Sequence, residues 1–252
     1  MGCISPGGFD LIGEAMDLCA FPAGARILEP GCGEGDTSAF LERAYGVKVT
    51  GIDSSEALLR RGRERHPGLD LRHGEMEMLD FPSFEFDGLI LECVLSLSPM
   101  QLEVLHEAWC VLKRGGKLIL ADLYRPNPDP AAVARAREAA REARRRPHEA
   151  GDCERDRDAP SEYCLAGAFV MDSLREAFAE IGFETLFWSD KTETLRAFAA
   201  EKILAHGSLE AFWQSVLPPG ADGDRFCRAD VRDAKGLGYF LTILKKPERT
   251  NE

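Results

Sequence analysis

Short hydrophobic runs alternate with helical patterns through the first half of the sequence. They fall at residues 26–28, 47–52, 69–71, 86–91 and 117–121. Short apolar runs separated by amphipathic helical segments are typical of βαβ units, in which the strands run parallel. The pattern therefore predicts five parallel strands connected by helices.

The helix before the fifth of these strands has a clear apolar stripe. Its hydrophobic positions repeat at i, i+3, i+7 and i+10, on one helical face: Leu102, Leu105, Trp109 and Leu112. The sequence Arg114-Gly115-Gly116 follows, and paired glycines disfavour a helix. We therefore expect the helix to end there and the fifth strand to open at Lys117.

A further helix and strand are expected after residue 170. Hydrophobic positions repeat at helical spacing over 171–181, with Ser173 and Glu176 spaced as a capping box and Gly182 as the stop signal. The next apolar run, 184–188, predicts a sixth strand.

The remainder of the chain adds two helices and a last strand. Two amphipathic patterns lie within 191–217, the second behind Ser208 as its N-cap, and an alternating run at 238–245 predicts the final strand. The predicted fold is therefore α/β: a Rossmann-like, seven-stranded, mostly parallel sheet with helices on both faces, a lid and a helical insertion.

Composition divides the chain into three parts. Residues 1–124 carry the strand–helix rhythm and form the predicted cofactor-binding core. Residues 125–165 begin with closely spaced prolines and continue as an Ala/Arg/Glu-rich stretch and a polar segment, which we interpret as a linker helix and a lid. Residues 166–252 complete the core, with the helical insertion at about 191–236.

Length and charge narrow the class of partner. The 252 residues are 44% hydrophobic and 29% charged, which is ordinary for a globular protein with a buried core. The net charge of −12 disfavours a nucleic-acid partner, because phosphate neutralisation needs a concentrated basic surface. No signal peptide or membrane span is predicted. A small-molecule substrate is expected, and the oligomeric state is left open.

Cysteine usage indicates the compartment. The eight cysteines have irregular spacing and no C-x-x-C pair, so we assign no metal site. Reduced thiols in a cytoplasmic protein fit this pattern.

A glycine-rich loop follows the first strand. Glu29-Pro30 leads into Gly31, Cys32, Gly33 and Gly35, and glycines allow a ligand to lie against bare backbone. A dinucleotide-binding loop would carry a further glycine at position 36. Asp36 stands there instead, and it is a helix N-cap type whose charge would repel a pyrophosphate. The loop therefore favours a ligand without phosphate.

S-adenosylmethionine (SAM) is such a ligand. Its ammonium and sulfonium groups would be attracted by Glu29 and the acidic surroundings. Asp53, with Ser54 beside it, ends the second strand, where a carboxylate can accept both ribose hydroxyls.

Successive motifs along the chain resemble those of class I SAM-dependent methyltransferases. They are E-P-G-C-G-E-G, G-I-D-S, H-G-E-M-E-M-L, F-D-G-L-I-L-E-C-V-L-S and V-L-K-R-G-G-K-L-I-L-A-D. The resemblance implies SAM as the cofactor, Glu75 and Met76 near the adenine, and Glu92 and Cys93 closing the fourth strand beside the methyl donor.

A second resemblance concerns the methyl acceptor. The stretch that begins E-C-V-L-S and the segment Y-C-L-A-G-A are similar to arsenite methyltransferases, which implies that Cys93 and Cys164 hold the metalloid. Trivalent arsenic is thiophilic, and thiolates are soft ligands. The alternative is that both cysteines are buried small hydrophobes.

The sequence thus predicts a methyltransferase acting on a small molecule, with arsenite or another thiol or metalloid compound as the most specific acceptor. Transfer to a soft, ionised nucleophile needs no dedicated base, whereas an oxygen or carbon nucleophile would need one. His106 and His148 are the candidates for that base. A SAM-binding sensor or complex partner without turnover, a methyltransferase of oxygen or carbon in a biosynthetic metabolite, and an oxidoreductase remain alternatives.

Overall fold

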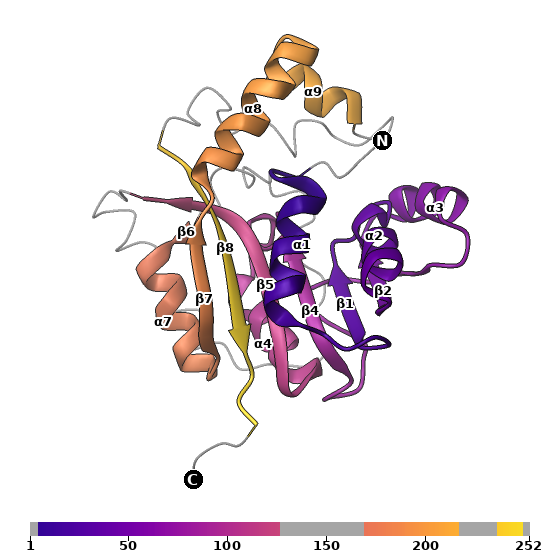
Figure 1. Cartoon of the computed structure of the whole chain (residues 1–252), viewed down its shortest axis with the longest axis vertical. Helices are drawn as coiled ribbons and strands as arrows, with labels where there is room; N and C mark the ends of the chain where they lie inside the picture. Colours follow the sequence, from indigo (N-terminus) through magenta and orange to yellow (C-terminus); the bar gives the residue numbers. More distant parts are fainter. Residues whose placement is uncertain (1–4, 127–168, 217–235, 249–252) are drawn as a thin grey trace.

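One sheet forms the centre of the computed structural model, which describes residues 5–126, 169–216 and 236–248 (Figure 1). Across the sheet the strands are β3 (Asp70–His73), β2 (Lys48–Asp53), β1 (Arg26–Pro30), β4 (Phe86–Glu92), β5 (Leu112–Arg125), β8 (Gly238–Lys245) and β7 (Glu184–Asp190). The two-residue β6 (Phe169–Val170) pairs with the end of β5. Among these strands only β8 is antiparallel to its neighbours. The predicted seven-stranded, mostly parallel sheet is confirmed, with β6 as an addition.

Helices cover both faces of the sheet. One face carries α1 (Gly8–Cys19) and α2 (Asp36–Tyr45), and the other carries α4 (Gln101–Val111) and α7 (Met171–Ile181). The helix α3 (Glu56–Arg65) packs beside β2 and β3. The helices α8 (Thr192–His206) and α9 (Leu209–Val216) lie beyond the end of the sheet where the parallel strands finish (Figure 1).

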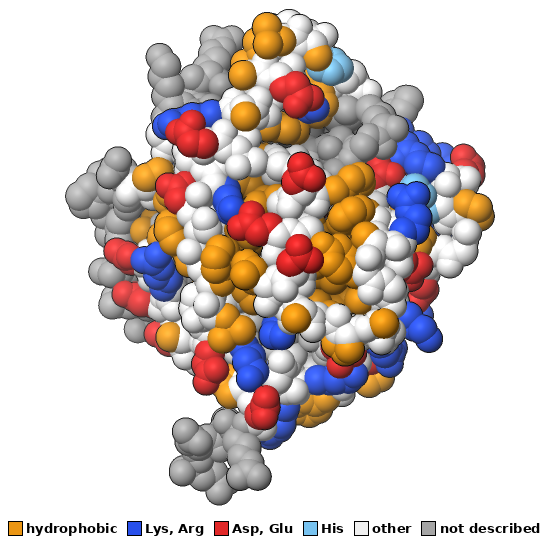
Figure 2. All heavy atoms as spheres, in the orientation of Figure 1, with side chains coloured by type: hydrophobic (Ala, Val, Ile, Leu, Met, Phe, Trp, Pro, Cys, Tyr) orange, Lys and Arg blue, Asp and Glu red, His pale blue; other side chains and the backbone are white. Residues whose placement is uncertain are grey.

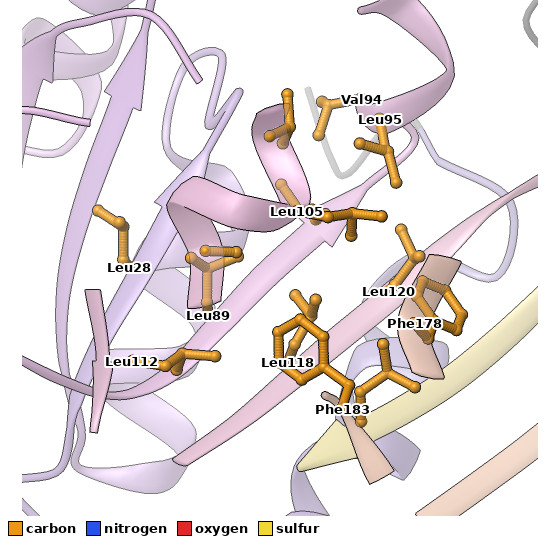
Figure 3. Packing of buried hydrophobic residues seen from close by; sticks show 14 of the residues in the cluster. Leu28, Leu89, Val94, Leu95, Leu105, Leu112, Leu118, Leu120, Phe178 and Phe183 are labelled. Carbon is orange, nitrogen blue, oxygen red and sulfur yellow. The ribbon is translucent and has the colours of Figure 1, made fainter. Parts of the chain in front are cut away.

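Alternation along the strands supplies both hydrophobic cores. In β5, Leu118 and Leu120 pack toward α4 and α7, while Ile119 between them packs toward α1. Successive side chains of a strand point to opposite faces, so a run of three apolar residues fills two cores. The larger core is the α4 and α7 side, where Phe178 packs among leucines of the central strands (Figure 3).

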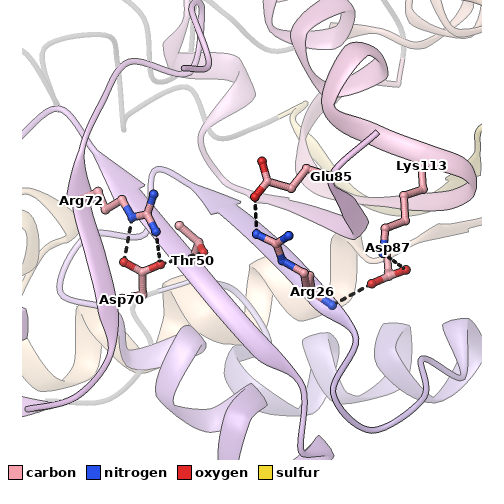
Figure 4. Close-up of polar contacts among 7 residues, drawn as sticks. All are labelled: Arg26, Thr50, Asp70, Arg72, Glu85, Asp87 and Lys113. Carbon is pink, nitrogen blue, oxygen red and sulfur yellow. Dashed lines mark hydrogen bonds and ion pairs between the residues drawn. The ribbon is translucent and has the colours of Figure 1, made fainter. Parts of the chain in front are cut away.

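Charged side chains at the edge where the parallel strands begin are paired with one another. Asp87 accepts hydrogen bonds from the backbone of Arg26 at 2.9 Å and from Nζ of Lys113 at 2.7 Å, and Arg26 also pairs with Glu85 (Figure 4). A mixture of acidic, basic and hydrophobic side chains covers the face that carries α1 (Figure 2). Ligands of open α/β sheets bind at the opposite edge, where the strands end.

The fifth strand begins earlier than predicted. Phe86 pairs with Leu112, whereas Gly88 pairs with Lys117, so the register shifts between these pairs. Gly115 donates its backbone N–H to the carbonyl of Lys246 at 2.7 Å. The two glycines therefore form an irregularity inside β5, stabilised by the end of β8, and do not end the helix.

The helix predicted over 171–181 is confirmed, but two predicted N-cap residues are wrong. The helix α7 begins at Met171, directly after β6, and Val170 is its N-cap without a side-chain hydrogen bond, so Ser173 lies inside the first turn. In α2 the N-cap is Gly35 and not Asp36. Pairing of β6 with β5 fixes where the chain can turn into α7, and this outweighs the local capping signal.

Other stop and start signals are confirmed. Gly182 ends α7 in a left-handed conformation, and the hydroxyl of Ser208 accepts the backbone N–H of Ala211 at 3.0 Å at the start of α9. The predicted lid lies largely outside the described residues. No helix among the described residues is long and apolar enough to cross a membrane.

We expect Phe178→Ala to lower the free energy of unfolding by about 3–5 kcal/mol, because it removes a buried ring from the larger core. Leu186→Ala is the control, since Leu186 is 51% exposed, and it should change stability by no more than about 0.5 kcal/mol. Urea unfolding followed by circular dichroism measures both. Equal effects of the two substitutions would contradict this packing.

Candidate functional site

The loop after β1 folds back onto the end of β2. The backbone N–H groups of Gly31 and Cys32 both donate to the carbonyl of Ile52, at 2.7 and 3.0 Å. Gly35 then donates to the carbonyl of Cys32 at 2.9 Å, which closes a tight turn immediately before α2. The loop is thus fixed by its own backbone at the carboxyl edge of the sheet.

The two central glycines of this loop have different structural roles. Both have positive φ angles, +73° for Gly31 and +56° for Gly33. A Cβ on Gly31 would lie 2.4 Å from Cγ1 of Val94, so this glycine lets the segment after β4 pass against the loop. A Cβ on Gly33 would meet no described atom within 4 Å. Of the two, Gly33 presents bare backbone to open space, as a ligand would require.

Two carboxylates point to the α1 and α2 side of the sheet beside this loop. Glu29 on β1 is buried, and its Oε2 accepts a hydrogen bond from the hydroxyl of Ser38. Glu92 ends β4, where it accepts hydrogen bonds from the hydroxyls of Thr37, at 3.3 Å, and Ser5. The sequence predicted both carboxylates but not the hydroxyl donors, because these are set by how α2 and the N-terminal segment dock.

The pKa of Glu29 is raised to about 8, mainly by burial, with the Ser38 hydrogen bond opposing the shift and the carboxylates of Glu92 and Asp53 adding to it. A buried carboxyl with other carboxylates nearby favours a cation in the adjacent space.

Asp53 closes β2 and connects it to the loop. Its Oδ2 accepts the backbone N–H of Gly33 at 2.9 Å and its Oδ1 accepts that of Ser55 at 2.8 Å. An ionised carboxylate can accept about four hydrogen bonds, so Asp53 keeps capacity for ligand hydroxyls. Burial raises the pKa of Asp53, and these two backbone hydrogen bonds oppose the shift. Ser54, beside it, is exposed.

The outer side of the loop is held by ion pairs with α3. Arg65 pairs with Asp36 at 2.9 Å and with Glu34 at 2.6 Å. His66 lies 2.7 Å from Asp36, and Arg61 pairs with Glu34 at 2.7 Å. Since Arg65 compensates the charge of Asp36, the repulsion of a pyrophosphate expected from Asp36 is weakened. The argument for a cationic ligand therefore depends on Glu29, Glu92 and Asp53.

The remaining cofactor candidates differ in their surroundings. Cys32 is buried against α3 and its thiol pKa is raised by desolvation, so its side chain is part of the packing. Glu75 is exposed and forms an isolated bridge with Met78, while Met76 packs on the larger core. Gly74 donates its N–H to the carbonyl of Asp53 at 3.2 Å, which brings this segment to the end of β2.

Cys93 directly follows β4. It is half-buried with a φ of +56°, its N–H donates to the carbonyl of Ala121 at 2.8 Å, and its Sγ lies 3.1 Å from the hydroxyl of Tyr239. The thiol therefore stands at the sheet edge, against the core but not fully inside it. Cys164 lies outside the described residues.

Of the two predicted bases, the one that the structure describes is not at this edge. His106 is exposed on α4, which covers the opposite face of the sheet, and His148 lies outside the described residues. In the described ranges no cluster of three or more His, Cys, Asp or Glu side chains is arranged to hold a metal ion.

Sequence reasoning missed Asp122, which is fully buried near the end of β5. Its carboxylate accepts the backbone N–H groups of Ser96 at 2.9 Å and Leu123 at 2.7 Å. It thereby holds the 3₁₀ helix η1 (Leu95–Leu97), which follows Cys93. Burial raises the pKa of Asp122 to about 6. An acidic residue inside the otherwise apolar run 118–124 was the available signal.

The raised pKa of Glu29 predicts a pH-dependent stability. In the unfolded chain the carboxyl loses its proton near pH 4.5, whereas the folded protein keeps it up to about pH 8. The folded state therefore binds more protons in this window, and its stability falls as pH rises through it. Between pH 6 and 9 the free energy of unfolding of the parent should fall by about 2 kcal/mol more than that of Glu29→Gln. Urea unfolding at each pH measures both. Equal pH dependence in the two proteins would refute the assignment.

Comparisons with known proteins find methyltransferases that are similar to part of this chain. Residues 27–116 match the model described as a methyltransferase domain. A demethylmenaquinone methyltransferase from Listeria welshimeri is 36% identical over 121 residues, or 45% of this chain and 51% of that protein. An arsenite methyltransferase from Mus musculus is 35% identical over 115 residues, or 39% of this chain and 31% of that protein. The chain spans about half the length, or less, of these relatives.

Solved structures share the fold. Phosphoethanolamine N-methyltransferase 2 from Haemonchus contortus, in complex with S-adenosyl-L-methionine, matches with a TM-score of 0.65 at 15% identity. The match covers 96% of this chain and 54% of that chain. Residues 27–116 are therefore a methyltransferase domain, and the chain shares its fold with solved methyltransferases, of which this one is in complex with S-adenosyl-L-methionine.

Proposed function

We propose that this chain transfers a methyl group from SAM to a small-molecule acceptor at the carboxyl edge of the sheet. The observation that supports this most directly is the open space beside the backbone of Gly33, with the carboxylates of Glu29, Asp53 and Glu92 around the same loop. A ligand that carries positive charge and no phosphate fits these surroundings.

The proposed roles follow the positions of the side chains. Asp53 accepts hydrogen bonds from the ribose hydroxyls, and Glu92 attracts the cationic groups. A cation bound nearby would lower the pKa of Glu29, so that Glu29 ionises and adds to this attraction. Glu75 and Met76 lie toward the adenine. When bound, SAM supplies a methyl group activated by a sulfonium. The protein's part is to hold the acceptor in line with it and to exclude water, since orientation accounts for much of the rate of such a displacement.

Cys93 defines the proposed acceptor side. We assign the acceptor to thiophilic compounds, arsenite first, with Cys164 as a second thiol ligand. Two observations support this class: Cys93 is only half-buried, and the described imidazole of His106 lies on the other face of the sheet. A relative carries the name arsenite methyltransferase, but another is named demethylmenaquinone methyltransferase, so quinols are the alternative acceptor.

The three-part organisation of the chain is part of the same proposal. Residues 1–124 form the cofactor-binding core, 125–165 the linker and lid, and 166–252 complete the sheet around the insertion at about 191–236. The described part of that insertion, α8 and α9, lies beyond the carboxyl edge, next to the proposed acceptor side (Figure 1).

Binding calorimetry tests the cofactor assignment. SAM and S-adenosylhomocysteine should bind and NAD should not, and Gly33→Ala should weaken SAM binding by about tenfold or more, which is about 1.4 kcal/mol. Gly24→Ala is the matched control, because Gly24 also has a positive φ and open space around it but lies in the turn before β1. Equal losses of affinity in both variants, or tight NAD binding, would remove this support.

Turnover tests the acceptor class. Purified protein with SAM and a panel of thiols, arsenite with glutathione, and quinols should release S-adenosylhomocysteine with arsenite or a thiol. Cys93→Ser should abolish binding of trivalent arsenic and leave SAM affinity nearly unchanged. Turnover of quinols alone would favour the carbon-acceptor alternative. Tight SAM binding with silence across the panel would favour a sensor.

A further inference from the structure

The side chain of Tyr239, on β8, contacts the thiol of Cys93, which follows β4. Its ring is fully buried on β8, among the hydrophobic residues that face α1. Its backbone carbonyl accepts the N–H of Lys191 at 2.7 Å, and its backbone N–H lies 3.3 Å from the hydroxyl of Thr192. These contacts at the junction of β7 and α8 fix the position of the ring, and with it the position of the phenol oxygen.

The phenol oxygen has one hydrogen-bond partner within the described residues, the sulfur of Cys93 at 3.1 Å. A buried tyrosine hydroxyl normally finds a partner, because an unsatisfied donor is costly away from water. Burial raises the pKa of Tyr239 well above its usual range, so the phenol keeps its proton at neutral pH. A thiolate at Cys93 would therefore receive a hydrogen bond from this hydroxyl.

Cys93 is also held in an uncommon backbone conformation. Its φ of +56° is left-handed, which costs about 1–2 kcal/mol for a residue with a side chain. Such a conformation persists when the surroundings fix it, and it occurs preferentially at functional sites. Here the N–H of Cys93 bonds to Ala121, and the next residue, Val94, packs against Gly31. The turn directs the thiol toward Tyr239 at the carboxyl edge.

We propose that Tyr239 is a positioning residue, whose hydroxyl orients the thiol of Cys93 and stabilises its thiolate for contact with the methyl acceptor. This inference rests on the proposed function, because it assigns Cys93 to the acceptor side. It adds that the reactivity of Cys93 is set from β8, a strand distant in sequence from the methyltransferase motifs.

The other charged groups around this pair oppose a thiolate. Glu92 on β4 and Asp122 on β5 both act on Tyr239 as negative charges and disfavour its ionisation. The same two carboxylates disfavour a further negative charge on the adjacent sulfur. The Tyr239 hydroxyl can donate a hydrogen bond to the sulfur and the two ionised carboxylates cannot, so its removal should be measurable.

Alkylation of Cys93 by iodoacetamide tests the proposal in the full-length chain. Peptide mass spectrometry follows the rate for Cys93 alone between pH 6 and 10. Tyr239→Phe keeps the ring and removes the hydroxyl, so the midpoint of the pH–rate profile should rise by about one unit and the rate at pH 7.5 should fall by about tenfold. Tyr124→Phe is the control, because it removes a phenol that bonds to Asp190 at 3.0 Å instead.

An unchanged profile in folded Tyr239→Phe, or an equal shift in Tyr124→Phe, would overturn the proposal. If Tyr239→Phe fails to fold, a ring-fluorinated tyrosine at position 239 replaces it. This side chain is a stronger donor and should speed the alkylation of Cys93, and no change in rate would overturn the proposal equally. Calorimetry with SAM on the same samples separates a failure of this inference from a failure of the proposed function. A shifted profile without SAM binding would refute the proposed function and leave the Tyr239–Cys93 interaction intact.

Discussion

The close contact between Gly31 and Val94 determines the arrangement of the site. The chain leaving β4 must pass within van der Waals distance of the loop that leaves β1, and only a residue without a side chain at position 31 leaves room for it. This contact brings the end of β4 against the glycine loop. Glu29 and Glu92, from two neighbouring parallel strands, then lie on the same face of the sheet. The position of Cys93, the residue before Val94, depends on the same contact between Val94 and Gly31.

The electrostatics of the two sheet edges differ. At the edge where the parallel strands begin, Arg26, Asp87 and Lys113 compensate one another near solvent. At the other edge a buried carboxyl, Glu29, has other carboxylates nearby and holds its proton to about pH 8. Burial of such a group costs stability, and proteins retain local conflicts of this kind mainly where function needs them. A cationic ligand at this edge would relieve the conflict.

A layer of hydrogen bonds behind the carboxyl edge supports the groups that face the open space. Ser38 and Thr37, in the first turn of α2, hold the two glutamates, and Asp122 holds η1. Tyr239 holds the thiol of Cys93. These donors and acceptors come from three elements, so the geometry of the edge depends on how α2, β5 and β8 dock. Groups that are oriented in this way before a ligand arrives need little reorganisation during the reaction.

The amino-acid sequence by itself determined the strands, the glycine loop and the acidic residue at the end of β2. Their signals are local: apolar runs of strand length, glycines that permit positive φ, and Asp53 directly after a predicted strand. It misplaced the start of β5 because Gly115 and Gly116, which disfavour a helix, here form an irregularity that pairs with Lys246, far along the chain. Only the tertiary structure decided that Gly31 serves packing and that Arg65 compensates Asp36. It also decided that Tyr239 meets Cys93. Each of these contacts joins elements distant in the sequence, and no local pattern of spacing records how such elements dock.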